Sequence, residues 1–342
     1  MHIASIGIDL GKTTFHLVAL DEHSKVVIKK KFSRKQLVAY TVNLCHSLIG
    51  MEACSGAHFF GATLRAQGHD VRLIPGQFVK PFVKSNKNDF IDAEAIAEAV
   101  TRHNMRFVPI KTDDQLDLQA LHRVRDRLVQ RRTAVINQIR GFLLERGITF
   151  AKGPAKLRNQ MPVILEDADQ NLTPRLRTLL DHLWQEWKQL QSDIEVVSGQ
   201  IEGISAEDAT CQRLRQIPGV GPLVATATVA AIGNGAAFHK GREFAAWLGL
   251  VPRQHSTGDK ARLSGISKRG NLYLRRMFVH GARAVLLVKY DTGDLGRWVH
   301  QLEARMARNK VIIAIANKLA RIAWAVLAKG EDYRSSAVCA HP

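Results

Sequence analysis

The chain is poor in cysteine and lacks any long uninterrupted apolar run. Its four cysteines are widely scattered and none forms a CxxC pair, which argues against a zinc site or a disulfide framework and fits the reduced cytosol. No apolar stretch approaches the roughly 18 residues that a transmembrane helix needs. The opening segment MHIASIGIDLGK has no charged region ahead of its apolar run, so it is not typical of a secretory signal. We therefore expect a cytoplasmic protein without a membrane partner.

Acidic residues are scarce relative to basic ones. The 342 residues include 31 Asp and Glu against 49 Lys and Arg, a net charge of +18. Such an excess attracts polyanions, and nucleic acid is the first candidate because neutralising its phosphates releases counterions. An anionic membrane surface is the rival. Hydrophobic residues make up 46% of the chain, enough for folded cores, and at roughly 150 residues per domain the length indicates two domains or slightly more.

The first hundred residues have the pattern of a mixed α/β domain. Three short apolar runs separated by turn sequences predict an antiparallel meander of three strands. Further strands then alternate with helices, as expected of an RNase H-like sheet. The predicted strands cover 2–8, 15–20, 25–32, 48–51 and 70–74, and the predicted helices cover 34–45, 57–67 and a segment from about 90.

The remainder is predicted to be mostly helical. Apolar residues at 3-and-4 spacing predict a helix over 113–146, whose other faces are rich in arginine. A second helix has Thr173 as N-cap and Pro174 at its first position, and then carries a heptad seam. That seam packs either on the preceding helix, which we favour, or on another subunit as a coiled coil. We expect a domain over 1–110, a helical or coiled-coil region over 111–205 and a third domain over 206–335.

Four carboxylates of the predicted domain 1–110 lie at the ends of strands or at the start of a helix. Asp9 and Glu52 each lie at the end of an apolar strand, where an acid is costly unless paired or bound to metal. Asp89 and Asp92 are three apart at a helix start and share a face. Each acid alone has a structural explanation, such as capping a helix. Together they predict a site for a pair of Mg²⁺ ions, because hard cations prefer oxygen ligands and two such ions act at phosphorus centres.

The C-terminal half combines a glycine turn with a basic loop. The segment 217–221 (IPGVG) resembles the turn of a helix–hairpin–helix, in which Gly219 and Gly221 let the backbone approach a phosphate; a plain helix connection is the alternative. Downstream, the basic loop contains or follows four hydroxyl residues. A hydroxyl among cations can attack a phosphodiester, although most loop hydroxyls only bind backbone. These residues are Ser256, Thr257, Ser264 and Ser267.

The motifs together resemble the RNA-guided transposases of the insertion sequence 110 family, and their sequences are most similar to those of its 1111 subgroup. They occur in order through nearly the whole chain: IGIDLGK, MEACSG, KNDFIDAEAIAE, IPGVGP, WLGLVPRQHSTG and GISKRGNLYLRR. The resemblance implies a RuvC-like domain with a DEDD quartet, matching Asp9, Glu52, Asp89 and Asp92. It implies a coiled-coil region and a transposase domain whose serine bonds covalently to DNA. It also implies dimers or tetramers on a structured non-coding RNA that pairs with donor and target DNA, in a prokaryotic nucleoid, with a composite site built from two subunits.

The family nucleophile adjoins the glycine after the PR-x-x motif, and here two residues compete for that role. Direct register places Thr257 before Gly258, with Ser256 one step earlier. We favour Ser256, since a primary hydroxyl attacks phosphorus with less crowding, and keep Thr257 as the alternative. The expected contacts to DNA and RNA are Arg123, Arg127, Arg131, Gly219, Gly221, Arg262, Lys268, Arg269, Arg275 and Arg276.

Three other functions share some of these sequence features. IGIDLGKTT is similar to the phosphate loop of actin-like ATPases and sugar kinases, but the later loops of those enzymes are missing. A RuvC-like endonuclease would use the four acids without a covalent intermediate. A non-catalytic nucleic-acid-binding protein would explain the charge but not the acids.

Overall fold

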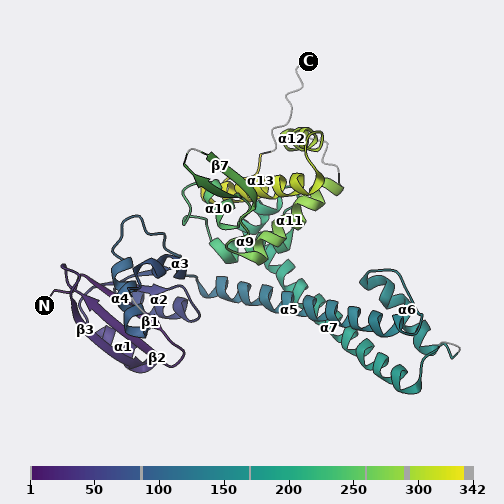
Figure 1. Cartoon of the computed structure of the whole chain (residues 1–342), viewed down its shortest axis with the longest axis horizontal. Coiled ribbons are helices and arrows are strands. Elements are labelled where there is room, and N and C mark those ends of the chain that lie inside the picture. The colour runs from purple at the N-terminus through teal and green to yellow at the C-terminus, as the bar shows by residue number, and fades with distance from the viewer. Residues whose placement is uncertain (1, 85–87, 169–170, 259, 289–292, 335–342) are drawn as a thin grey trace, which may run out of the picture. The chain divides into compact units, whose positions relative to one another are not determined.

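The computed structural model describes the chain except residues 1, 85–87, 169–170, 259, 289–292 and 335–342. It divides into two compact units, Met1–Thr112 and Asp113–Pro342 (Figure 1). Lys87 of the KND motif and Cys339 lie outside the described residues.

The first unit is a five-stranded mixed sheet with the order β3-β2-β1-β4-β5. The first three strands pair antiparallel as the predicted meander, and β4 and β5 continue the sheet in parallel with β1. The α/β prediction for this region is confirmed. The elements are β1 (Ser5–Leu10), β2 (Thr14–Leu20), β3 (Val26–Ser33), α1 (Arg34–Val42), β4 (Leu48–Glu52), α2 (Ala57–Ala66), β5 (Asp70–Ile74), α3 (Gly76–Val79), η1 (Lys80–Phe82) and α4 (Asp89–Ala99).

Strand alternation assigns each face of this sheet to different helices. Ile6 and Ile8 of β1 are fully buried in the core that includes residues of α1 and α2. Gly7, between them, faces α4. A Cβ atom on Gly7 would lie 2.0 Å from the Ala93 carbonyl oxygen and 2.4 Å from the Ala97 nitrogen. Because α4 rests directly on the β1 backbone there, Asp9, two residues further along the same face, points toward the side where α4 begins.

The second unit begins with a long helical hairpin. α5 (Asp113–Leu144) packs along α7 (Pro174–Glu207), and α6 (Pro154–Glu166) completes their shared core. The Thr173 hydroxyl accepts a hydrogen bond from the Leu176 nitrogen at 3.3 Å, as the predicted cap. Trp187 and Leu190 of the heptad seam are buried in this core. The partner of the seam is therefore a helix of the same chain.

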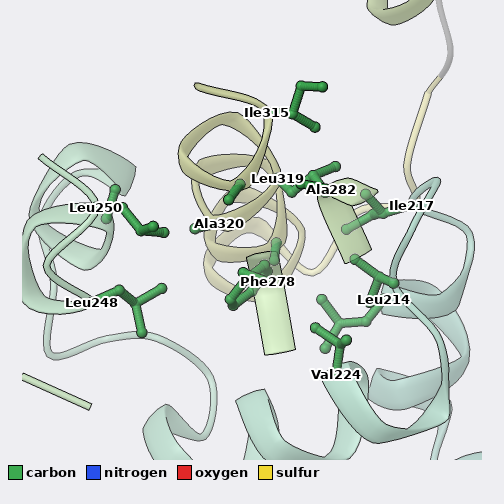
Figure 2. Packing of buried hydrophobic residues seen from close by; sticks show 14 of the residues in the cluster. Leu214, Ile217, Val224, Leu248, Leu250, Phe278, Ala282, Ile315, Leu319 and Ala320 are labelled. Atoms are coloured by element: carbon green, nitrogen blue, oxygen red, sulfur yellow. The ribbon is translucent and has the colours of Figure 1, made fainter. Parts of the chain in front are cut away.

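The rest of the second unit is built around α13. Figure 2 shows side chains from α8, α9, α11 and the segment after α10 gathered around this helix. α13 is long and apolar enough to cross a membrane, but half of its most apolar window is buried. A core helix has the same properties. The elements are α8 (Ala209–Arg215), α9 (Pro222–Ile232), α10 (Gly241–Trp247), β6 (Pro252–Thr257), β7 (Lys260–Ile266), α11 (Leu272–Leu287), α12 (Gly293–Glu303) and α13 (Arg308–Lys329).

One prediction for this region was wrong. The segment expected to be a basic loop between helices is a two-stranded antiparallel hairpin, β6–β7. Every residue of β6 is exposed. Because neither face is buried, the sequence has no apolar alternation to reveal the strands.

Candidate active site

Asp9 and Glu52 lie side by side at the ends of two parallel strands. β1 and β4 pair in parallel, with Ile8 beside Met51. Asp9 and Glu52 are the next residues on their strands, so the same register carries both acids to one edge of the sheet. Their strands are buried up to that point, which places two carboxylates where the core opens to solvent.

The other two acids occupy the first turn of α4. Asn88 caps this helix by accepting from the Phe90 nitrogen at 3.0 Å. Asp89 and Asp92 follow directly. Asp89 Oδ2 lies 3.5 Å from Nδ1 of His16, a largely buried side chain of β2 that is the cross-strand neighbour of Asp9. His16 thus stands between a strand acid and a helix acid, a role that the sequence pattern alone did not indicate.

Asp9 is the electrostatic centre of this cluster. Burial raises the pKa of its carboxyl, and repulsion from Asp92, Asp89 and Glu52 raises the pKa further, while His16 lowers it. All three other predicted acids are therefore close enough to act on Asp9. The carboxylate of Glu52 lies close to the start of α3, since a Cβ on Gly76 would lie 2.3 Å from Glu52 Oε1.

This donor set suits a divalent cation. Within the described residues, no three His, Cys, Asp or Glu side chains are already gathered at distances that would hold one ion. The chemistry of the set nevertheless fits: four carboxylates offer the oxygen ligands that hard cations prefer. Burial and the neighbouring acids raise the pKa of Asp9, and a bound cation would favour its charged form.

The hairpin of the second unit separates the two candidate nucleophiles. Ser256 pairs with Ala261 and Thr257 pairs with Lys260. Since successive residues of a strand point to opposite faces, the two hydroxyls point to opposite sides of the hairpin. Ser256 Oγ accepts a hydrogen bond from Gln254 Nε2 at 2.7 Å.

The two other hydroxyls of this region have structural partners. Ser264 Oγ donates to the Arg253 carbonyl at 3.4 Å, and Ser267 Oγ accepts from the Arg269 nitrogen at 3.5 Å. Ser267 lies in the turn where Lys268 adopts a positive φ of 55°. Both side chains hold local backbone, as most hydroxyls in loops do.

Two family models match the chain. Residues 6–147 match one described as a transposase, and residues 211–295 match one described as the transposase IS116/IS110/IS902 family. Together the two segments cover more than half of the chain. The chain belongs to the IS116/IS110/IS902 family of transposases. It is therefore an insertion-sequence transposase, an enzyme that cuts and recombines DNA, and its DEDD-type domain indicates dependence on a divalent metal.

Relatives of this transposase match along almost its entire length. The transposase for insertion sequence element IS1111A of Coxiella burnetii (strain RSA 493 / Nine Mile phase I) is 44% identical over 98% of this chain and 92% of its own. The transposase for IS1328 of Yersinia enterocolitica is 44% identical over 96% of this chain and 98% of its own. A shorter match, 30% identical over 35% of this chain and 37% of the relative, is to a pilin gene-inverting protein of Moraxella bovis.

The glycine turn of the transposase packs backbone against backbone. Gly219 has a φ of +79°, and a Cβ there would lie 2.5 Å from the Gly281 carbonyl oxygen of α11. A Cβ on Gly281 would in turn lie 2.2 Å from the Gly219 oxygen. Helix packing thus explains Gly219 without a phosphate. Gly221 is exposed at the N-cap of α9, with nothing near its Cβ position, and stays a candidate phosphate contact.

The arginines predicted to contact nucleic acid differ in their exposure and in whether the guanidinium group already has a partner. Arg275 is only 8% exposed, and its Nη1 donates to the carbonyls of Leu248 and Arg269 at 2.9 and 2.8 Å. Its guanidinium is therefore occupied by backbone carbonyls, and the structure does not support the expected phosphate contact at Arg275. Arg276 is paired with Asp126 of α5.

The remaining basic residues of the predicted set lie on the surface. Arg131 pairs with Glu186 at 3.0 Å. Arg123 and Arg127 are exposed one turn apart on α5, and neither has a carboxylate partner among the described residues. The hairpin and the turn after it contribute exposed cations at Arg262, Lys268 and Arg269.

Proposed function

We propose that this transposase breaks and rejoins DNA through a Mg²⁺-dependent carboxylate centre and a covalent hydroxyl–DNA intermediate. Asp9, Glu52, Asp89 and Asp92 are the ligands. The observation that carries the proposal is the strand register that sets Asp9 beside Glu52, together with Asp89 and Asp92 in the first turn of the helix that rests on β1. A bound divalent cation would polarise the scissile phosphate and stabilise charge on the attacking and leaving oxygens.

Ser256 is the proposed nucleophile. Its oxygen forms a bond to phosphorus, the bond from phosphorus to the bridging strand oxygen breaks, and that oxygen leaves with the proton that the hydroxyl has released through solvent. The hydrogen bond from Gln254 supports this choice, because a donor held on the attacking oxygen stabilises its developing negative charge. Thr257 is the alternative on the opposite face of the hairpin.

The finer architecture belongs to the same proposal. The sheet with α4 is RNase H-like in the RuvC manner, the α5–α7 hairpin is a coiled-coil-like region, and α8 and α9 form a helix–hairpin–helix around residues 217–221. A three-part division over 1–110, 111–205 and 206–335 follows from this reading. The resemblance to the family and the match to a gene-inverting protein support a recombinase of this type.

Guidance by a structured non-coding RNA, and assembly as dimers or tetramers, complete the proposal. The family resemblance implies both. The net charge of +18 supports a large nucleic-acid partner. Arg123 and Arg127 of α5 and Arg262 of the hairpin are exposed and have no carboxylate partner among the described residues, so they offer phosphate contacts. DNA at the donor ends and at the target is the substrate.

The test is a trapping assay on the full chain with Mg²⁺, the element's flanking RNA and labelled donor-end DNA, analysed on a denaturing gel for a protein–DNA adduct. The variants are Asp9→Ala, Ser256→Ala and Thr257→Ala, with Ser264→Ala as the matched hydroxyl control in the same hairpin. We expect Asp9→Ala and Ser256→Ala to abolish the adduct. Loss with Thr257→Ala alone would move the nucleophile by one residue. Metal-dependent cleavage without an adduct in any lane would replace the proposal by a plain endonuclease.

A further inference from the structure

A basic, aromatic cleft lies at the root of the β6–β7 hairpin and takes no part in the site above. It has a volume of about 940 Å³ and is lined by α10, α12, α13 and the ends of the two hairpin strands that lie away from the turn. Pro252 and Ile266, the first residue of β6 and the last of β7, form one side of it. The cleft lies wholly within the second unit.

The charge of this cleft has one sign. Five Lys and Arg side chains line it and no Asp or Glu does, among the residues described. None of these cations has a carboxylate partner in the described parts of the chain. Four of the five are exposed, so their charge is available to a ligand. They are Lys240, Arg242, Lys310, Lys318 and Arg321.

Two indole rings stand among these cations. Trp324 is held rigidly, since its Nε1 donates to the Gly235 carbonyl at 3.1 Å and its ring lies 3.2 Å from the Cβ position of Gly241. Trp298 lines the cleft from α12, with Lys318 Nζ 4.4 Å from the centre of its ring. Both tryptophans are only partly buried. Aromatic platforms flanked by cations are the recurrent means of binding unpaired nucleotides, because every base has a face that stacks.

We infer that this cleft binds single-stranded DNA, with an unpaired base stacked on Trp298 and the flanking phosphates on Lys310 and Arg321. The inference rests on the proposed function, in which the hairpin carries the nucleophile. Pro252 and Ser256 are four residues apart on one strand, about 13 Å at roughly 3.3 Å per residue. A strand end held at Ser256 therefore reaches the cleft within a few nucleotides, which favours DNA over RNA or protein as its occupant.

The experiment measures binding of the full chain to fluorescent oligothymidylate of about 16 nucleotides. EDTA is present throughout, so that no covalent step is involved and failure of the proposed chemistry cannot affect the result. The test variant is Lys310→Gln/Arg321→Gln. The control is Lys156→Gln/Arg175→Gln, which removes the same charge from exposed residues of α6 and α7. Thermal unfolding checks that each variant is folded.

We expect the test variant to lower the magnitude of the slope of log affinity against log salt by about 1.4, at roughly 0.7 per lost phosphate contact on a single strand. The control variant on the single strand should keep the wild-type slope. The test variant should also keep the wild-type slope on duplex DNA of the same sequence. Trp298→Leu should weaken binding about fivefold or more, and should have no such effect on an abasic strand of equal length.

Several outcomes would overturn the inference. Equal slopes for test and control variants would mean that the cleft does not contact phosphate. An equal loss of affinity for duplex and single-stranded DNA would mean that the cleft is a general electrostatic surface. A loss confined to oligouridylate would assign it to RNA, and a change in sedimentation of the free protein would assign it to a second copy of the chain.

Discussion

At the scale of single residues, the glycine beside Glu52 makes a sharp prediction. A Cβ on Gly76 would meet Glu52 Oε1 at 2.3 Å, and the obstructing atom is the far end of a flexible side chain. Gly76→Ala should therefore cost little stability but should displace a proposed metal ligand. We expect adduct formation to fall roughly 10- to 100-fold, as for other groups that orient ligands, with partial recovery at high Mg²⁺.

The comparison for this substitution is Glu52→Gln, which removes the charge without moving the side chain. It should lower activity without recovery at high Mg²⁺. If Gly76→Ala kept full activity at low Mg²⁺, the present position of the Glu52 carboxylate would not be required for metal binding.

A second residue-scale prediction concerns His122 of α5, a buried histidine with partners on both ring nitrogens. The Thr226 hydroxyl donates to the Pro222 carbonyl at 2.7 Å, so His122 Nε2 donates to Thr226 Oγ1 and Nδ1 accepts from the Tyr273 hydroxyl, both at 2.9 Å. This arrangement requires the neutral ring. Burial, with a smaller contribution from Arg125, lowers the pKa of His122 from 6.5 to about 4.

The sign of the pH effect follows from that pKa. The unfolded chain takes up the proton first as pH falls, so the stabilisation is complete above pH 6.5 and is lost progressively down to about pH 4. The loss amounts to about 3 kcal/mol. Denaturant unfolding at both ends of this window should show a smaller pH dependence for His122→Gln than for wild type. His182→Gln, at an exposed histidine of α7, should leave the dependence intact.

At the scale of elements, the contact between β1 and α4 sets the position of two acids. Any side chain at Gly7 meets backbone atoms of α4 at 2.0 and 2.4 Å, and backbone cannot rotate away. Gly7→Ala should destabilise the first unit by several kcal/mol, at or above the upper end of overpacking costs. It should also abolish adduct formation, because α4 carries Asp89 and Asp92.

Gly50 of β4 provides the matched comparison. A Cβ there would lie 2.8 Å from the Cβ atom of Val100 and 3.1 Å from Cγ2 of Ile96, so the overlap is smaller than at Gly7. In denaturant unfolding, Gly50→Ala should lower the free energy of unfolding clearly less than Gly7→Ala does. Equal costs would mean that α4 is not fixed by its backbone contact.

The elements also show where sequence patterns suffice. Strands β1, β2, β4 and β5 were predictable because one or both of their faces are buried and their apolar residues are visible in the sequence, as at Ile6 and Ile8. The hairpin β6–β7 was not, since its residues face solvent. Arg275 resembles its basic neighbours in sequence, and only the fold shows that two carbonyls surround it. The role of His16 depends on strand register, which residue types alone do not determine.

At the scale of the whole molecule, the net charge of +18 overstates the charge available to nucleic acid. Arg131 and Arg276 are neutralised by Glu186 and Asp126, whereas Arg123 and Arg127 have no carboxylate partner among the described residues. Only cations that replace counterions on phosphate contribute to the salt dependence of binding.

Two double variants with the same change in net charge separate these classes. Arg123→Gln/Arg127→Gln should lower the magnitude of the slope of log affinity against log salt on duplex DNA by about 1.8, at roughly 0.9 per contact. Arg131→Gln/Arg276→Gln should lower the magnitude of this slope by well under the roughly 0.9 expected of one contact, because those guanidinium groups already have carboxylate partners. Fluorescence anisotropy over a salt series measures both. Equal slopes would show that the total charge, rather than the exposed face of α5, governs how this transposase holds its nucleic acid.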